Sequence, residues 1–230
     1  MEIKRIVVCG DSLCSAQTND NQHFSNILAD RGYEVINLAR GSMTNTGICF
    51  QIKQAIDIQA DLVIFRKTDS SRLDVPLYPS PSSNITLKNF IYPYTCDSSF
   101  GNEYVGDINA NILSDNATGL SNKRPGSLIT IPDAMVNAVK NYYTFLFDRY
   151  LAEEKDRWIF GYWKHCLSTA SIPYIELTVD GIGKEIYEYI EKNPDKVKDS
   201  LYHTTAEPQQ KVADAIIHEI QRLILQKNML

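Results

Sequence analysis

The residues Ile6-Val7-Val8-Cys9-Gly10-Asp11-Ser12-Leu13 give the clearest indication of the fold. Its first four residues form an apolar, largely β-branched run, which predicts a buried strand. Glycine, aspartate and serine then favour a turn. Open α/β sheets bind their ligands at the carboxyl ends of the strands. The strand therefore presents Ser12 where a serine can act as a nucleophile, provided that a histidine reaches it.

Of the histidines in the sequence, His203, near the other end of the chain, has the local sequence that best suits a partner for Ser12. Thr204 or Thr205 can cap the helix that is expected to follow, and Pro208 fits its first turn. The apolar residues of that helix recur at steps of three and four: Val212, Ala215, Ile216, Ile220, Leu223 and Ile224. We therefore expect His203 on a loop before a terminal helix, from which it can point back over the sheet edge.

Strands and helices alternate along most of the chain. Further strands are expected over residues 34–38, 61–65 and 172–177. The first helix should open at His23, and Arg31-Gly32-Tyr33 should end it. Later helices are expected over residues 46–59, 133–151, 153–168 and 184–198. This order predicts an α/β fold with right-handed crossovers: a three-layer α/β/α, flavodoxin-like arrangement around a mostly parallel sheet.

One irregular segment interrupts this order within an expected single domain over residues 1–230. Residues 74–132 are rich in Pro, Ser, Asn, Gly and Tyr and show little periodicity. A segment of this length without regular elements is usually a lid, a binding loop or an irregular insertion. Its aromatic side chains could stack on a sugar ring, or they could anchor the insertion to the body of the domain.

Composition narrows the class of function. The formal net charge of −5 and the absence of a basic run argue against nucleic-acid binding as the main task. No apolar run approaches the roughly 20 residues that span a bilayer, and the charged start, residues 2–5, does not resemble a signal peptide. The five cysteines lack metal-ligand spacing, so we expect reduced thiols, a cytoplasmic location, and neither metal nor cofactor. The oligomeric state is not indicated.

With an early Ser12 and a late His203, the sequence resembles the GDSL-type esterase/lipase family, the SGNH hydrolases. Gly10-Asp11-Ser12-Leu13 matches the first block of that family, and residues 35–42 resemble the second. The resemblance implies that Ser12 is the nucleophile, His203 the general base and Asp199 the residue that orients the histidine. It also implies an oxyanion hole formed by the backbone amides of Ser12 and Gly41.

The chain departs from the family pattern in two places. The third block usually reads Gly-x-Asn-Asp, but here the strand over residues 62–65 is followed by Arg66-Lys67-Thr68-Asp69. Thr68 therefore stands at the asparagine position and would be a third, weaker oxyanion donor, with Arg66 or Lys67 as substitutes if it does not face the oxyanion. The family's Asp-x-x-His is also one residue longer, running from Asp199 to His203.

Three functions remain open from the sequence. The first is a serine ester hydrolase acting on a small acyl group, including an acetylated carbohydrate. The second is a catalytically impaired relative that binds a carbohydrate or a protein partner. The third is a nucleotide-binding protein, which the absence of a Gly-x-Gly-x-x-Gly or Walker sequence disfavours.

Overall fold

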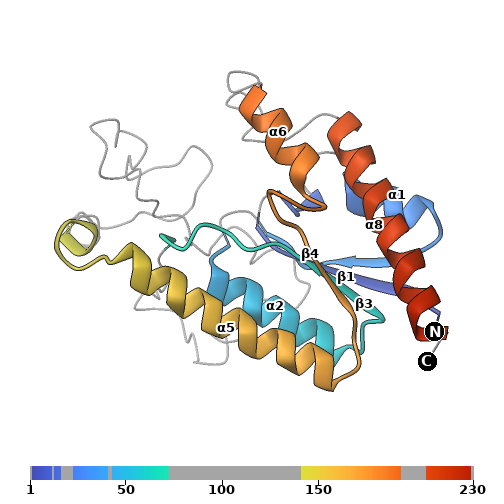
Figure 1. Ribbon diagram of the computed structural model, residues 1–230, viewed down its shortest axis with the longest axis horizontal. Helices are drawn as coiled ribbons and strands as arrows, with labels where there is room; N and C mark the ends of the chain where they lie inside the picture. The colour runs from blue at the N-terminus through green and yellow to red at the C-terminus, as the bar shows by residue number, and fades with distance from the viewer. Residues whose placement is uncertain are drawn as a thin grey trace, which may run out of the picture. The chain divides into compact units, whose positions relative to one another are not determined.

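A computed structural model describes residues 2–11, 13–16, 23–40, 43–72, 141–192 and 206–228. The elements labelled in Figure 1 follow one another along the chain as strands alternating with helices. They are β1 (Arg5–Cys9), α1 (Phe24–Asp30), β2 (Glu34–Asn37), α2 (Asn45–Asp57), β3 (Leu62–Phe65), α5 (Arg149–Thr169), β4 (Tyr174–Glu176), α6 (Lys184–Lys192) and α8 (Ala206–Asn228).

The four strands within the described residues form one parallel sheet in the order β2-β1-β3-β4. Val7 of β1 pairs with Ile36 on one side and with Val63 on the other, and Ile64 of β3 pairs with Ile175 of β4. Parallel strands need crossover connections, which is why a helix separates each strand from the next. The prediction of an α/β fold with a parallel sheet is confirmed.

The ends of α1 lie where the sequence predicts them. His23 caps the helix, because its side chain accepts a hydrogen bond from the backbone N–H of Ser25. After Asp30 the chain turns at Gly32, whose φ of 96° favours glycine. The turn leads directly into β2, which begins at Glu34.

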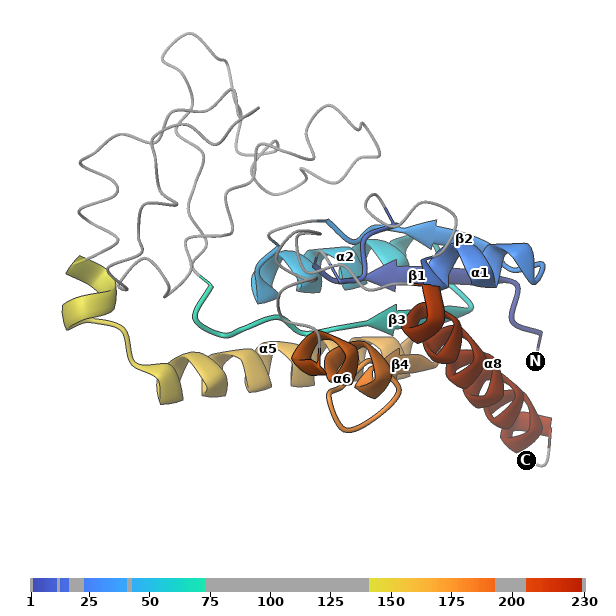
Figure 2. The same ribbon diagram turned by 90° about the horizontal axis from the view of Figure 1, so that it is seen from above.

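The compact unit that holds the sheet comprises residues 1–41, 47–67 and 160–230. One face of the sheet packs against α1, α6 and α8, which lie together in Figures 1 and 2. The buried residues of this cluster are apolar: they include Ile6, Val8, Phe24, Leu28, Leu62, Ile64, Ile175, Ile186, Val212, Ile216 and Ile220. Because alternate residues of a strand point to opposite faces, Val7 and Val63 face the other way. They are fully buried as well.

Helix α5 also covers Phe65, the last residue of β3. The ring of Phe65 stacks on Phe160 with 5.7 Å between centroids, and both are almost completely buried. The predicted helix break between residues 151 and 153 is wrong, because α5 runs through it. Asp148 sets the start of the helix instead, since its Oδ1 accepts from the N–H of Leu151 at 3.0 Å.

A second compact unit comprises residues 42–46 and 68–159. Its described part contains helical residues 141–145, the beginning of α5 and the loop over residues 68–72. The insertion predicted over residues 74–132 lies outside the described residues, so its nature stays a prediction. The single-domain organisation stays a prediction as well.

Candidate functional site

The turn after β1 begins at Gly10, whose backbone is held on both sides. The buried side chain of Gln51, from α2, accepts from the N–H of Gly10 at 2.6 Å and donates to its carbonyl at 3.3 Å. Gly10 has a φ of 154°, and a Cβ at this position would lie 2.8 Å from the Cβ and Sγ of Cys14. Only glycine fits here, because any side chain would collide with Cys14.

Asp11 shapes the next part of the turn and carries a buried charge. Its Oδ1 accepts from the N–H of Leu13 at 3.2 Å, and its carbonyl accepts from the N–H of Cys14 at 3.1 Å. Arg66, the residue after β3, donates from Nη1 to the same Oδ1 at 2.5 Å. The side chains of Asp11 and Arg66 are only 2% and 13% exposed. The interpretation of Asp11 as a turn-forming residue is confirmed, and its ion pair was not predicted.

Polar side chains from β2 and α1 hold the far end of the turn. Asn37 donates from Nδ2 to the carbonyl of Cys14 at 2.8 Å. His23 Nδ1 accepts from the N–H of Ser25 at 3.2 Å, and its Nε2 lies 3.4 Å from the carbonyl of Leu13. These contacts require the neutral tautomer with the proton on Nε2. His23 is therefore a buried structural histidine in this arrangement.

All these contacts converge on the carboxyl end of β1. The chain runs from β1 outward to β2 and then returns to β3 on the opposite side of β1, so the strand order reverses between β1 and β3. Ligands of open α/β sheets bind outside the carboxyl ends of the strands at such a reversal. Gly10, Asp11, Leu13 and Cys14 lie at this point, and we call residues 10–14 the nucleophile turn after the role predicted from the sequence for Ser12.

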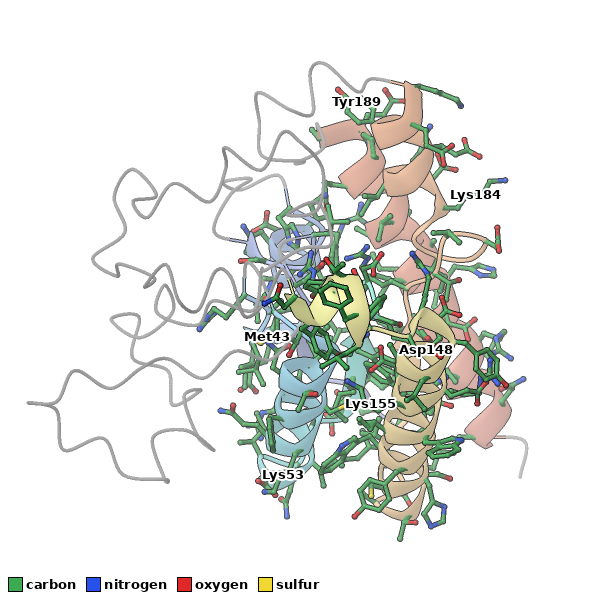
Figure 3. The ribbon with its side chains drawn as sticks, turned by 90° about the vertical axis from the view of Figure 1, so that its left-hand side faces the viewer. Met43, Lys53, Asp148, Lys155, Lys184 and Tyr189 are labelled. Atoms are coloured by element: carbon green, nitrogen blue, oxygen red, sulfur yellow. The ribbon has the colours of Figure 1, made fainter. Side chains whose placement is uncertain are left out.

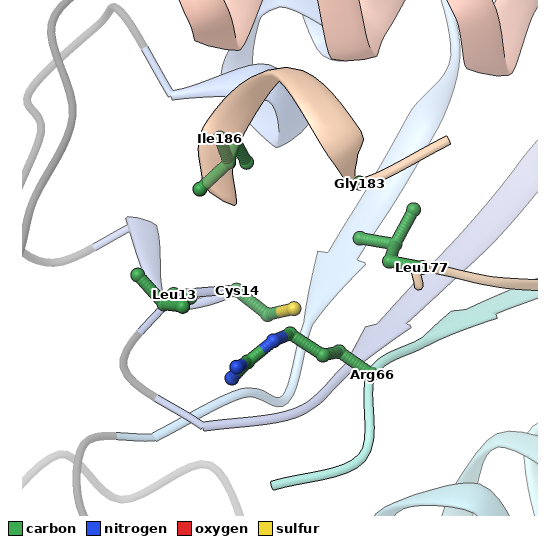
Figure 4. Close-up of a pocket in the computed structure, with 6 residues that line it drawn as sticks. All are labelled: Leu13, Cys14, Arg66, Leu177, Gly183 and Ile186. Carbon is green, nitrogen blue, oxygen red and sulfur yellow. The ribbon is translucent and has the colours of Figure 1, made fainter. Parts of the chain in front are cut away.

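A small pocket opens beside the nucleophile turn (Figure 4). Its cavity volume is about 10 Å³, which is room for about one water molecule. Its lining residues come from the ends of three strands and the start of α6: Leu13, Cys14, Arg66, Leu177, Gly183 and Ile186. Burial raises the pKa of the Cys14 thiol to about 12, and the charge of Asp11 adds to this effect. Cys14 is therefore a neutral wall of the pocket at physiological pH, not a nucleophile.

Lys67, the neighbour of Arg66, belongs to a different cluster. Its Nζ lies 3.0 Å from Glu176 Oε1, and Lys164 of α5 approaches Oε2 at 2.5 Å. Although burial opposes ionisation, hydrogen bonds from Lys164 and Lys67 lower the pKa of Glu176 below its usual value. Of the two cations proposed as substitutes for Thr68, Arg66 holds the nucleophile turn and Lys67 pairs with Glu176.

Thr68 lies in the second unit, where its backbone is tightly held. Its N–H donates to Oδ1 of Asn45 at 2.8 Å, and its carbonyl accepts from Nδ2 of Asn45 at 3.0 Å. The same Nδ2 also donates to Oδ2 of Asp156 at 2.6 Å, which fixes the orientation of the amide. Asn45, Thr68 and Asp156 are all buried. Asp156 is enclosed although its neighbour Lys155, labelled in Figure 3, is exposed.

Two further contacts order the loop that follows Thr68. Arg72 donates from Nη1 to the carbonyl of Met43, also labelled in Figure 3, at 2.9 Å. The hydroxyl of Tyr143 donates to the carbonyl of Ser71. The loop over residues 68–72 is therefore a fixed part of the second unit, held by side chains that are distant in sequence.

The other residues predicted for the site are Ser12, Gly41, Asp199 and His203, and they lie outside the described residues. Their roles stay predictions. Sequence reasoning did not identify Gln51, Asn37 or the pairing of Arg66, although these side chains hold the turn that contains Ser12. A polar residue directly after a buried strand is the one signal that could have pointed to Arg66.

No protein-family model, curated protein or solved structure matches this chain. Across the described ranges, no helix combines the length and the apolar character that a membrane crossing requires.

Proposed function

We propose that this chain is a serine ester hydrolase that uses Ser12, His203 and Asp199 to transfer a small acyl group to water. The observation that carries the proposal is the nucleophile turn. Side chains from α2, from β2 and from the residue after β3 hold it at the reversal of strand order, where α/β sheets bind ligands. Buried groups that order a turn on every side favour a reacting residue within it, because catalysis depends on fixed geometry.

The proposed chemistry is acyl transfer in two steps. His203 takes the proton of the Ser12 hydroxyl as Oγ attacks the ester carbonyl, and then gives that proton to the leaving alcohol. Water then attacks the acyl-enzyme with the same histidine as base, which releases the acid. Asp199 orients the imidazole and stabilises its cation. The backbone amides of Ser12 and Gly41 donate to the oxyanion, and no metal or cofactor is needed.

The same proposal extends to the architecture. The observed strand order, β2-β1-β3-β4, is the beginning of the flavodoxin-like order 2-1-3-4-5. We infer a three-layer arrangement of the SGNH type, in which residues 193–205 bring His203 to the carboxyl edge of the sheet. The substrate would be a small ester, including an acetylated carbohydrate if the aromatic residues of the insertion contact a sugar.

A second candidate is an impaired relative that binds a carbohydrate or a protein without hydrolysing an ester. The observation that favours it is the hydrogen bond from the backbone N–H of Thr68 to the side chain of Asn45. That amide cannot donate to an oxyanion in this arrangement, so only the threonine hydroxyl could replace the family's asparagine.

A covalent serine probe tests the proposal. A fluorophosphonate should label the wild type, and Ser12→Ala should abolish labelling because it removes the attacking oxygen. Ser168→Ala, at an exposed position of α5, is the matched control and should be labelled as the wild type is. His203→Ala should lower hydrolysis of p-nitrophenyl acetate at least about a thousandfold. Labelling that survives Ser12→Ala would place the nucleophile elsewhere.

Substitutions at Thr68 distinguish the two candidates. Loss of one oxyanion donor costs about a hundred- to a thousandfold in turnover. Thr68→Val keeps the shape and should lower kcat, whereas Thr68→Asn should raise it by up to that factor. The bonds from Asn45 to Thr68 use only the backbone, so both variants should retain them. Equal kcat values for all three side chains would mean that position 68 does not face the oxyanion. An inactive wild type that Thr68→Asn activates would favour the impaired relative.

A further inference from the structure

Helix α5 carries large apolar side chains on the side opposite to its buried side. Leu151, Trp158 and Tyr162 are 63%, 71% and 61% exposed, and they follow one another at steps of seven and four residues. These steps bring the three side chains onto one face of a helix. Phe160 and Leu167 occupy the buried side. The outer face of a surface helix is normally polar, so an aromatic outer face indicates an interaction surface.

We propose that this face joins two copies of the chain in a two-fold dimer with antiparallel α5 helices. The face, which we call the α5 face, comprises the residue before the helix and five residues within it, all exposed: Asp148, Leu151, Lys155, Trp158, Tyr162 and His165. They alternate at steps of three and four residues, which is the spacing of a coiled-coil seam. The proposal is independent of the hydrolase function, because it involves neither the nucleophile turn nor the chemistry at Ser12.

The spacing of the α5 face is the same in both directions along the helix. A two-fold interface is isologous, so each contact between two different positions occurs twice. Antiparallel helices centred between Lys155 and Trp158 place Leu151 against the partner's Tyr162 and Lys155 against the partner's Trp158. Asp148 then lies against the partner's His165. Every position of the α5 face therefore has a counterpart on a second copy, and none has to pair with itself.

The side chains that this register pairs are chemically complementary. At the centre, the ammonium group of Lys155 lies over an indole ring, which is the best aromatic acceptor of a cation. At each end, the carboxylate of Asp148 faces an imidazole, which can donate a hydrogen bond. A parallel, in-register pair would instead place Lys155 against Lys155 and Asp148 against Asp148, and like charges disfavour such an interface. Charge complementarity therefore favours a second copy in the antiparallel direction.

The area of the α5 face suits a weak dimer. A fully exposed tyrosine or tryptophan side chain presents about 150–250 Å², and more than half of Trp158 and Tyr162 is exposed. With both copies and the flanking residues, the dimer would bury on the order of 1,000 Å², which is near the lower limit for a specific interface. A dimer of this size should have a Kd in the micromolar range and should dissociate on dilution.

Sedimentation equilibrium of the full chain, from about 1 μM to about 1 mM, measures the association. The wild type should show a reversible monomer–dimer equilibrium. Leu151→Glu should raise Kd about tenfold, and Trp158→Glu at least about thirtyfold, since aromatic residues at the centre of an interface dominate its affinity. Leu225→Glu is the matched control, because Leu225 is also 63% exposed but belongs to α8. It should leave Kd unchanged.

A pair of cysteines tests the antiparallel register. Asp148→Cys/His165→Cys places two thiols against each other across the dimer and leaves the apolar centre of the face intact. Within one chain these positions are separated by 17 residues, which is about 25 Å of helix. In a background that carries Cys96→Ser and Cys166→Ser, mild oxidation should link the double variant into a covalent dimer. Either single variant should stay unlinked.

Three outcomes would overturn the proposal. A wild type that remains monomeric up to about 1 mM would do so, and protection of Trp158 from iodide quenching in a Trp163→Phe background would then show that the chain covers the face itself. A dimer that both Leu151→Glu and Trp158→Glu leave intact would place the interface elsewhere. Equal cross-linking by the single and double cysteine variants would exclude the antiparallel register.

Discussion

Arg66→Met should destabilise the protein by about 3–5 kcal/mol, because it leaves the carboxylate of Asp11 buried without its cation. Asp11 is 2% exposed and Arg66 13%, so water cannot replace the lost partner. For a chain of 230 residues this loss corresponds to a fall in Tm of roughly 10 °C. Thermal unfolding followed by circular dichroism measures it. Fluorophosphonate labelling should fall as well, since Asp11 shapes the turn that contains Ser12.

The double variant Asp11→Asn/Arg66→Met identifies the cause. Asparagine keeps the oxygen that accepts from the N–H of Leu13 but carries no charge, so most of the lost stability should return. Lys192→Met is the matched control for loss of a cation. Lys192 pairs with Glu188 on the exposed surface of α6, and its removal should leave Tm nearly unchanged. An Arg66→Met variant as stable as the Lys192→Met variant would contradict a buried ion pair.

Asp199→Asn should lower turnover by up to roughly ten-thousandfold while the protein stays folded. Loss of a triad aspartate has an effect of this size, because the histidine loses the group that fixes its tautomer and stabilises its cation. The measurement is kcat for p-nitrophenyl acetate. KM should change much less than kcat, since in the proposed mechanism the aspartate acts on the histidine and not on the substrate.

The matched control for this substitution is Asp180→Asn. Asp180 is an exposed aspartate after β4, so the same loss of charge should leave kcat unchanged. A small effect of Asp199→Asn, with His203→Ala still inactive, would indicate a Ser-His dyad oriented by a backbone carbonyl or by water. The spacing from Asp199 to His203 is one residue longer than in the family pattern. Asp199→Asn therefore tests directly whether the aspartate still orients the histidine at this longer spacing.

Local sequence was sufficient for the described strands and for several helix ends. The runs at residues 6–9 and 62–65 are apolar and largely β-branched, and both form buried strands. His23 and Gly32 mark the two ends of α1 through interactions with near neighbours. The break predicted near Leu151 was wrong because Asp148 caps the helix a few residues earlier, and no proline or glycine interrupts residues 149–160.

The order of the described strands and helices and the parallel sheet could be predicted from the residues, because these features follow from hydrophobic periodicity and from the need for crossovers. The side chains that hold the nucleophile turn could not be predicted in this way. Gln51 and Arg66 lie 41 and 55 residues from their partners, Gly10 and Asp11. The meeting of Arg66 with Asp11 depends on the place of β3 beside β1 and on the register of that pair, whereas Gln51 reaches Gly10 from α2. No local pattern encodes such a meeting, because it arises only when the sheet has assembled.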